Sequence, residues 1–170
     1  MTAQQIILVA TATSTALIAG LFYSYSCSVN LGLGKLPDAG YIAAMQSINK
    51  EILNPLFFAS FMGTLLLLPI SAWLQYKIGA YQSFHLLVVA TLVYAVGVFG
   101  VTLFGNVPLN NALAGFNLPS ASIEAVSKQR ARFEIPWNRL HTVRTIFVII
   151  SLILVIIALL KNRDIIASVK

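Results

Sequence analysis

Residues 137–160 read WNRLHTVRTIFVIISLILVIIALL, and this stretch decides the fold class of the chain. From Thr145 to Leu160 it contains no charged residue, whereas a helix on the surface of a soluble protein carries charges along one face. A helix that crosses a membrane needs about 20 consecutive, mostly apolar residues. The stretch therefore predicts a transmembrane helix, followed by Lys161 and Arg163 at the membrane interface.

Three further stretches meet the same criterion. They run from about Ala3 to Val29, from Pro55 to Gln75 and from His85 to Phe104. Of the 170 residues, 58% are hydrophobic and only 9% are charged, against about 25% charged in soluble proteins. We therefore predict a single all-α domain over residues 1–170, a membrane-spanning four-helix bundle with short amphipathic helices in the two long connections. Such a chain is a multi-pass integral membrane protein, and in a bacterium it is expected in the cytoplasmic membrane.

Turn and cap residues predict where these helices begin and end. Asn54 can cap the second span, and Pro55 suits its first position because the missing N–H is unpaired there in any case. The segment Gly105–Pro108 is expected to end the third span. Pro136 is expected to separate a helix over Ser122–Glu134 from the fourth span.

The first long connection contains a predicted amphipathic helix. Asp38 can cap it, and its apolar positions from Tyr41 to Leu53 form one continuous face. Asn49 falls in the middle of that face. Because an unpaired buried amide costs about 1–3 kcal/mol, Asn49 needs a partner.

Small residues indicate where helices can approach closely. In the first span they recur every four residues, which gives a ridge suited to packing within the bundle or against a second copy of the chain in a homo-oligomer. Gly97 and Gly100 allow close approach in the third span. The ridge consists of Ala12, Ala16, Gly20, Ser24 and Ser28.

The net charge of +6 does not indicate nucleic-acid binding. The basic residues lie in connections and at helix ends, where they meet membrane lipids or set topology. The long connections carry seven Lys and Arg and the opposite side carries four, which favours cytoplasmic long connections. The seven are Lys35, Lys50, Lys128, Arg130, Arg132, Arg139 and Arg144, and the four are Lys77, Lys161, Arg163 and Lys170.

Antiparallel spans bring polar residues from several helices to the long-connection side. Trp137, His141 and Arg144 share one helix face, since they are four and three residues apart. At 1.5 Å per residue, Arg144 lies about 10 Å beyond Trp137, near the edge of the hydrocarbon. An arginine there either extends to the headgroups or points inward to a partner. We interpret the whole group as a shared pocket: Asn49, Asn54, Asn106, Asn110, Arg132, Trp137, Asn138, His141 and Arg144.

Structural alternatives apply to the same residues. The asparagines can serve only as helix caps, and Glu134 or Glu51 can neutralise Arg144 in a structural network. No metal or cofactor is predicted, because the chain has only two histidines and His85 belongs at the opposite end of the bundle. A haem ligated by His141 alone stays open as an alternative.

Three stretches carry a resemblance to a known family. The first runs from GLFYS at residues 20–24 to LPD at residues 36–38, and the second is NKEILNPLF at residues 49–57. The third is GNVPLN at residues 105–110, which continues with RFE at residues 132–134 and WNRLHTVRT at residues 137–145. With them, the chain resembles the anthrone-oxygenase-like family of small four-helix membrane proteins over nearly its whole length. The resemblance implies oxidation of an anthrone to an anthraquinone with dioxygen, without a classical cofactor.

The implied chemistry suits the residues present. An anthrone has an acidic methylene group, so a protein need only hold the ring, remove a proton and stabilise the oxyanion. His141, with an ordinary pKa of roughly 6.5, is the candidate base. Arg144 is the candidate oxyanion partner, and Trp137 offers a stacking surface. The candidate amide donors are Asn106, Asn110 and Asn138.

Two functions therefore stay open. The first is an oxygenase that acts on a lipophilic anthrone, phenol or quinol, with that small molecule and dioxygen as its partners. The second is a non-catalytic membrane module that binds a lipid or small amphiphile, or supports a partner protein. The position of Arg144 separates them, because a side chain directed at lipid would leave no site beside His141.

Overall fold

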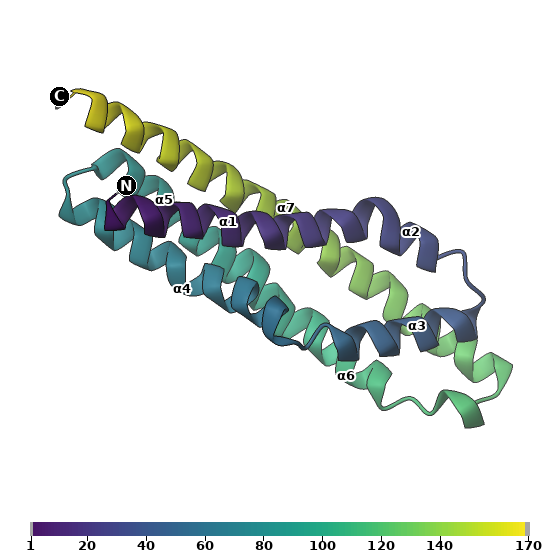
Figure 1. Ribbon diagram of the computed structural model, residues 1–170. Helices are drawn as coiled ribbons and strands as arrows, with labels where there is room; N and C mark the ends of the chain where they lie inside the picture. Colours follow the sequence, from purple (N-terminus) through teal and green to yellow (C-terminus); the bar gives the residue numbers. More distant parts are fainter. Residues whose placement is uncertain (1, 169–170) are drawn as a thin grey trace.

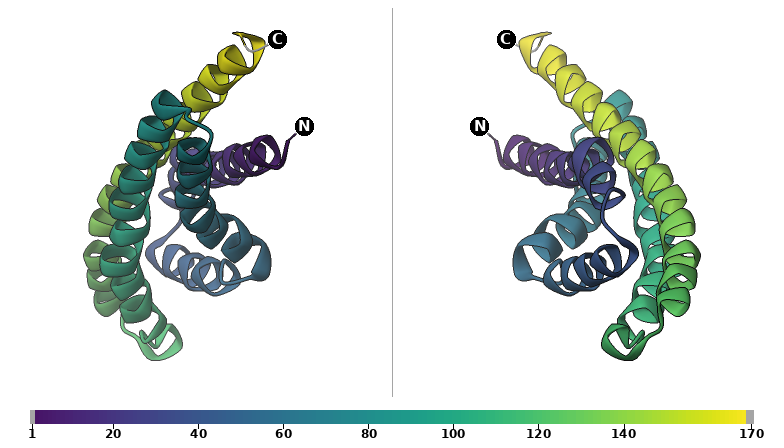
Figure 2. Two further views of the ribbon diagram at one scale, coloured as in Figure 1. Left: turned by 90° about the vertical axis from the view of Figure 1, so that its left-hand side faces the viewer. Right: turned by 90° about the vertical axis from the view of Figure 1, so that its right-hand side faces the viewer.

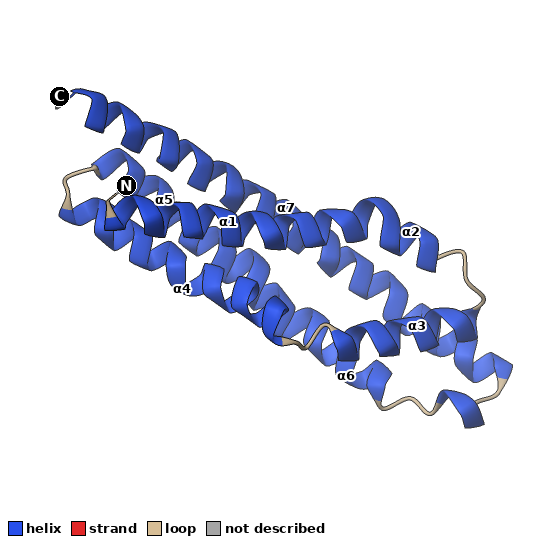
Figure 3. Ribbon diagram, viewed as in Figure 1, coloured by secondary structure: helices blue, strands red, loops and turns tan. Residues whose placement is uncertain are grey.

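A computed structural model describes residues 2–168, with side chains from Thr2 to Lys161. Over residues 2–168 the chain forms helices and no strand (Figure 3). Four helical stretches are long and apolar enough to cross a membrane, which confirms the predicted all-α bundle: Ala3–Leu33, Pro55–Lys77, Tyr81–Ala114 and Ile123–Lys161. The side chain of Arg163 and all of Lys170, both included in the charge count above, lie outside the described residues.

Several spans are assembled from more than one helical type. The first span is α1 (Ala3–Ser24), a π-helical turn (Tyr25–Val29) and α2 (Asn30–Leu33). The third is α5 (Tyr81–Tyr94), two π-helical segments (Ala95–Gly100 and Thr102–Asn106) and α6 (Val107–Ala114). The remaining elements are α3 (Asp38–Glu51), α4 (Pro55–Lys77), a 3₁₀ turn (Leu118–Ser120) and α7 (Ile123–Ser168).

The four spans form an antiparallel bundle. Helix α1 packs against α4 and α7, and α5 packs against the same two helices. Both termini lie at one end of the bundle, and α3 and α6 lie at the other (Figure 1). Figure 2 shows α5 and α7 side by side along their length. The two long connections therefore meet at a single end, as the antiparallel spans predict.

The expected end of the third span at Gly105–Pro108 is wrong, because the helix continues to Ala114. The two π-helical segments before Val107 explain the continuation. A π-helical turn bonds each N–H to the carbonyl five residues earlier and shifts the register of the helix. Pro108 consequently falls in the first turn of α6, where its missing N–H costs little.

The expected break at Pro136 is also wrong. Helix α7 is continuous through Pro136, which lies in its interior. An interior proline costs about 3 kcal/mol because it removes a hydrogen bond and crowds the preceding turn. Phe133 and Trp137, only 2% and 3% exposed, flank it and are packed against α3 and α6. Burial of these two large rings offsets the cost.

The buried apolar residues form two clusters. The larger one, called here the membrane cluster, joins all four spans and includes Leu68, Leu87 and Val155. The smaller one, called here the connection cluster, lies at the end that holds α3 and α6. The residues of the connection cluster are Tyr41, Ile42, Met45, Leu113, Val126, Phe133 and Trp137.

Helix α3 uses the predicted apolar face, but not the predicted cap. Tyr41, Ile42 and Met45 are buried on that face. Asp38 as the cap is wrong, since Pro37 occupies that position and Asp38 lies in the first turn. The Asp38 carboxylate instead pairs with Arg130 of α7 at 2.9 Å. This ion pair ties the start of α3 to the fourth span.

Only one of the two predicted glycine contacts is present. A Cβ atom on Gly97 would lie 1.9 Å from Phe147 Cδ1, so α5 and α7 can approach there only because the side chain is absent. The prediction for Gly100 is wrong, since the nearest heavy atom is the Ala95 oxygen of its own segment. Gly105 makes the second close approach, with a Cβ position 2.9 Å from Leu140 Cδ1.

The small-residue ridge of α1 does not pack in the bundle beyond Ala12. Ala16, Gly20, Ser24 and Ser28 are exposed, so that part of the packing prediction is wrong. The hydroxyl-bearing face is buried instead, because Thr11 hydrogen-bonds to Ser71 of α4 at 2.7 Å. A satisfied hydroxyl holds two membrane helices together. Packing of the ridge against a second copy stays a prediction.

Candidate functional site

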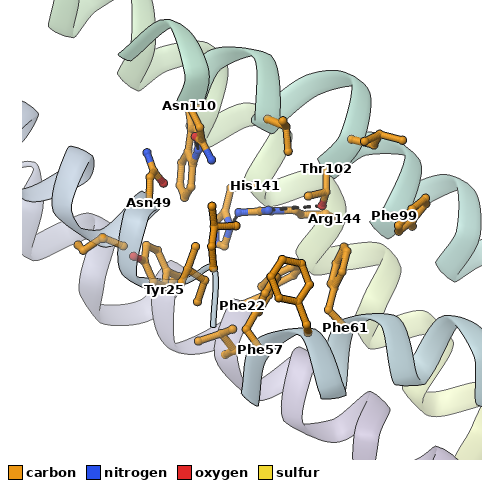
Figure 4. Close-up of a pocket in the computed structure, with 18 of the residues that line it drawn as sticks. Phe22, Tyr25, Asn49, Phe57, Phe61, Phe99, Thr102, Asn110, His141 and Arg144 are labelled. Carbon is orange, nitrogen blue, oxygen red and sulfur yellow. Dashed lines mark hydrogen bonds between the residues drawn. The ribbon is translucent and has the colours of Figure 1, made fainter. Parts of the chain in front are cut away.

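A cavity of about 210 Å³ lies between the membrane cluster and the connection cluster (Figure 4). All four spans and α3 contribute to its wall. The lining includes Phe22, Phe57, Phe61 and Trp137, and most of its surface is aromatic or aliphatic. Five of the predicted site residues line it: Asn49, Asn110, Trp137, His141 and Arg144.

Arg144 points into the bundle and is only 8% exposed. Its guanidinium carbon lies 4.4 Å from the centre of the Phe22 ring and 5.2 Å from that of Trp137. The two terminal nitrogens donate to Thr102 Oγ1 at 3.5 Å and to His141 Nδ1 at 3.3 Å. The side chain is thus held as a buried cation against aromatic rings, and it does not extend to the headgroups.

No carboxylate compensates this charge among the described side chains. The ion pairs found there join Arg130 to Asp38 and to Glu134. Neutralisation of Arg144 by Glu134 is therefore wrong, and Glu51 is exposed. Within the same residues Arg144 Nε has no hydrogen-bond partner. A buried, uncompensated guanidinium favours an anion or a strong acceptor nearby.

His141 is 1% exposed and forms hydrogen bonds at both ring nitrogens. Its Nδ1 lies 3.3 Å from the Arg144 guanidinium, which can only donate, so Nδ1 must accept. The ring proton is then on Nε2, 3.0 Å from Ser26 Oγ, and the Ser26 hydroxyl donates to the Phe22 oxygen at 3.1 Å. These contacts assign a neutral imidazole whose Nδ1 lone pair is held beside Arg144.

The same contacts bear on metal and haem binding. An axial haem ligand needs a free ring nitrogen, whereas both nitrogens of His141 have protein partners. His85 is exposed at the other end of the bundle. Among the side chains described, no three His, Cys, Asp or Glu residues gather as a metal site. In this arrangement neither ring nitrogen of His141 is free to ligate a haem iron.

Trp137 orders the aromatic part of the site. Its ring stacks on His141 with the centroids 5.3 Å apart and the planes inclined by 8°. Its Nε1 donates to Asn110 Oδ1 at 2.8 Å. An indole N–H is a donor only, so this bond fixes the orientation of the Asn110 amide. The stacked pair therefore carries one fixed carboxamide at its edge.

The remaining predicted residues lie outside the cavity wall. Asn54 caps α4, as predicted, by accepting from the Phe57 N–H at 3.0 Å. Asn106 is fully buried and donates to the Trp137 oxygen at 3.4 Å. Arg132 is exposed on α7, and Asn138 is half-buried beside the site.

Sequence reasoning missed the contribution of the first span. Phe22 and Tyr25 line the cavity, and the Tyr25 ring lies 5.8 Å from His141 and 6.0 Å from Trp137. Ser26 binds the imidazole directly. The available signal was the pair of aromatic residues near the end of a helix otherwise rich in Ala, Ser and Thr. The π-helical turn that begins at Tyr25 leaves no trace in the hydropathy pattern.

The cavity opens on the outer surface of the bundle. Four of its lining residues are large, apolar and exposed, with exposed fractions of 65%, 44%, 36% and 44%. Two belong to α4 and one to the third span, both of which are long and apolar enough to cross a membrane. The rim of the opening is therefore apolar, which suits contact with lipid. The four residues are Leu53, Phe58, Met62 and Leu103.

Fold and site together define a class: a four-helix membrane protein with an apolar cavity that encloses a buried Arg–His pair. The family model for anthrone oxygenase matches residues 56–154, which is more than half of the chain and includes His141 and Arg144. The chain belongs to the anthrone oxygenase family. It has no match among curated proteins or among solved structures.

Proposed function

We propose that the protein oxidises a lipophilic anthrone, phenol or quinol with dioxygen and uses no bound metal or organic cofactor. One observation carries the proposal: within residues 2–161, Arg144 is buried without a carboxylate partner, and it donates to a neutral His141 at 3.3 Å. A fixed cation stabilises a developing oxyanion, and a neutral imidazole accepts a proton. Membership of the anthrone oxygenase family supports the anthrone as the first substrate to test.

The first step is removal of a proton from the substrate. An anthrone that enters the cavity would place its oxygen on Arg144, which then releases the lone pair of His141 Nδ1. This nitrogen takes a proton from the methylene carbon, and the resulting enolate oxygen stays on the guanidinium. The Ser26 contact at Nε2 keeps the imidazole in the required tautomer.

The second step is the reaction of the enolate with dioxygen. The carbanion carbon reduces dioxygen and forms a C–O bond, which gives a peroxide. The imidazolium returns its proton to that peroxide, the O–O bond breaks, and the carbon loses its second hydrogen. One oxygen atom becomes the new carbonyl and the other leaves as water, so the anthrone is oxidised by four electrons and dioxygen is fully reduced.

Oxygen consumption by the purified protein with anthrone tests this proposal. We expect His141→Ala to lower the catalysed rate by about 10²-fold or more, the usual contribution of a general base. His85→Ala is the matched control, because His85 is exposed and far from the cavity, and it should keep the wild-type rate. Equal rates for wild type and His141→Ala would remove His141 from the mechanism.

A binding module without catalysis is the second candidate, and the lipid-facing mouth of the cavity favours it. Such a module would hold a lipophilic anion against Arg144 and release it unchanged. Saturable binding of anthrone under argon, together with no oxygen uptake in air, would select this function. In a bacterium, either activity would be located in the cytoplasmic membrane.

A further inference from the structure

Several unpaired polar atoms of the cavity are hydrogen-bond donors. Arg144 presents Nε, which has no partner among residues 2–161. Thr102 Oγ1 is already engaged, since it donates to the Val98 oxygen at 2.7 Å and accepts from Arg144. The lone pair of His141 Nδ1 is likewise occupied by Arg144. A ligand that pairs with Arg144 Nε must therefore supply an acceptor.

A second set of donors lies apart from Arg144. Trp137 holds Asn110 Oδ1, so the Asn110 amide nitrogen is the atom left to bind a ligand. Asn49 also lines the cavity, and its Nδ2 is buried without a partner in the described chain. An unpaired buried amide costs about 1–3 kcal/mol, and a ligand oxygen would remove that cost.

The two sets of donors lie at different places along the cavity. Asn110 and Thr102 belong to the same span and are eight residues apart, so they lie on different turns of it. Thr102 contacts Arg144, whereas Asn110 contacts Trp137. Figure 4 shows Asn49 and Asn110 on one side of His141, and Phe61 and Phe99 on the other.

We infer that Asn49 and Asn110 form a second binding station, which donates hydrogen bonds to a second oxygen of a flat, lipophilic ring ligand. The first oxygen lies on Arg144, and this orientation rests on the function proposed above. The preferred ligand then has acceptor oxygens on opposite edges of the ring system. Oxidation of an anthrone creates such an oxygen across the middle ring from the first, so the station binds the quinone product more tightly than the anthrone.

Fluorescence of the single tryptophan at the site can measure this preference. The chain has two tryptophans, and Trp73 is 56% exposed on α4, away from the cavity. In a Trp73→Phe background the emission reports on Trp137 alone. The full-length protein in detergent is titrated under argon with 9,10-anthraquinone, which has two opposite oxygens, and with anthrone, which has one. Without dioxygen no turnover contributes to the signal.

Asn49→Leu should weaken anthraquinone binding about tenfold, as expected for one lost hydrogen bond, and should change anthrone binding less than twofold. Asn49→Asp is nearly the same size as Asn49 and should weaken anthraquinone binding further, since it replaces donors with an acceptor. It also tests the station if the leucine variant fails to fold. Asn111→Leu is the matched control, because Asn111 is exposed and outside the cavity.

Unchanged binding of both rings by the Asn49 variants would overturn the station, and so would an equal loss for both rings or no binding by the wild type. The result is independent of turnover. A selective loss of anthraquinone in a protein that consumes no oxygen would support the station and reject the oxygenase. Oxygen consumption without a selective loss of anthraquinone binding would support the oxygenase and reject the station.

Discussion

Near the chain termini the spans pack through satisfied contacts, whereas at the long-connection end they surround an open cavity. In the first region Ser83 donates to the Ala158 oxygen at 2.9 Å, and Ser151 donates to the Ala90 oxygen at 3.2 Å. In the second region Arg144 Nε and Asn49 Nδ2 have no partner within the described side chains. Unpaired buried groups cost stability, and they persist where a site needs them.

Gln75 qualifies this contrast. It lies in the terminal half of α4, is fully buried and has no partner for either side-chain atom among the described residues. Gln75 does not line the cavity. The comparison of the two regions is therefore restricted to the α5–α7 interface and to the surroundings of the Arg144–His141 pair. Four substitutions test it, in order of decreasing effect on stability.

Gly97→Ala should have the largest effect. The new Cβ would lie 1.9 Å from Phe147 Cδ1 and 2.7 Å from Phe147 Cβ, an atom that cannot move without the backbone of α7. We expect a loss of about 3 kcal/mol or more in the free energy of unfolding, as for overpacked cores. Titration of the micelles with SDS measures this value. A change below about 1 kcal/mol would show that α5 and α7 adjust freely.

Arg130→Met should have the next largest effect. Arg130 donates to Asp38, to Glu134 and to the Leu36 and Gly34 oxygens, and it stacks on Tyr41 at 4.6 Å. Because its side chain is only partly exposed, we expect a loss of about 1–2 kcal/mol.

The loss in Arg130→Met should be local. Hydrogen exchange of α3 should increase, whereas α5 should keep its protection, because Arg130 ties α3 and the preceding turn to α7. Lys128→Met, two residues away and exposed, is the control and should leave both helices unchanged. Uniform loosening of the whole bundle would contradict a clamp that acts on α3 alone.

Gly105→Ala is the matched counterpart of Gly97→Ala at the cavity end. Its Cβ would lie 2.9 Å from Leu140 Cδ1, but the contacts are to the end of a flexible side chain that can change rotamer. We expect a loss of about 1 kcal/mol or less in the same SDS titration. A loss equal to that of Gly97→Ala would erase the difference between the two regions.

Arg144→Met should change stability least, although it removes the most deeply buried charge of the site. Replacing a buried ionic group by an apolar one of similar volume is often neutral or stabilising. We expect the free energy of unfolding to stay within about 1 kcal/mol of the wild type, while oxygen consumption with anthrone is lost. A large destabilisation would mean that Arg144 holds the bundle together.

The hydropathy pattern predicted the four spans because lipid imposes a length and a composition that few other structures share. Helical spacing likewise placed Trp137, His141 and Arg144 on one face, and the antiparallel order brought Asn49 and Asn110 to the same end. These predictions depend only on helix geometry. These five residues line the cavity, whereas the other four predicted site residues lie outside its wall.

Other features depend on packing and could not be predicted from local sequence. Pro108 and Pro136 suggest helix ends, yet π-helical turns and buried aromatic rings carry the helices past both. The rotation of α1 follows from hydroxyl contacts with α4, which decide that Phe22 and not Gly20 faces inward. Such choices between faces are tertiary, since several faces of an apolar helix are equally compatible with lipid.

The opening lined by Leu53, Phe58, Met62 and Leu103 determines whether a ligand enters the cavity from lipid or from water. A molecule that arrives through it has already left water, so its occupancy follows its mole fraction in the lipid and not its total concentration in the sample. Adding empty vesicles or detergent should then dilute the ligand and lower the occupancy, although the amounts of protein and ligand are unchanged.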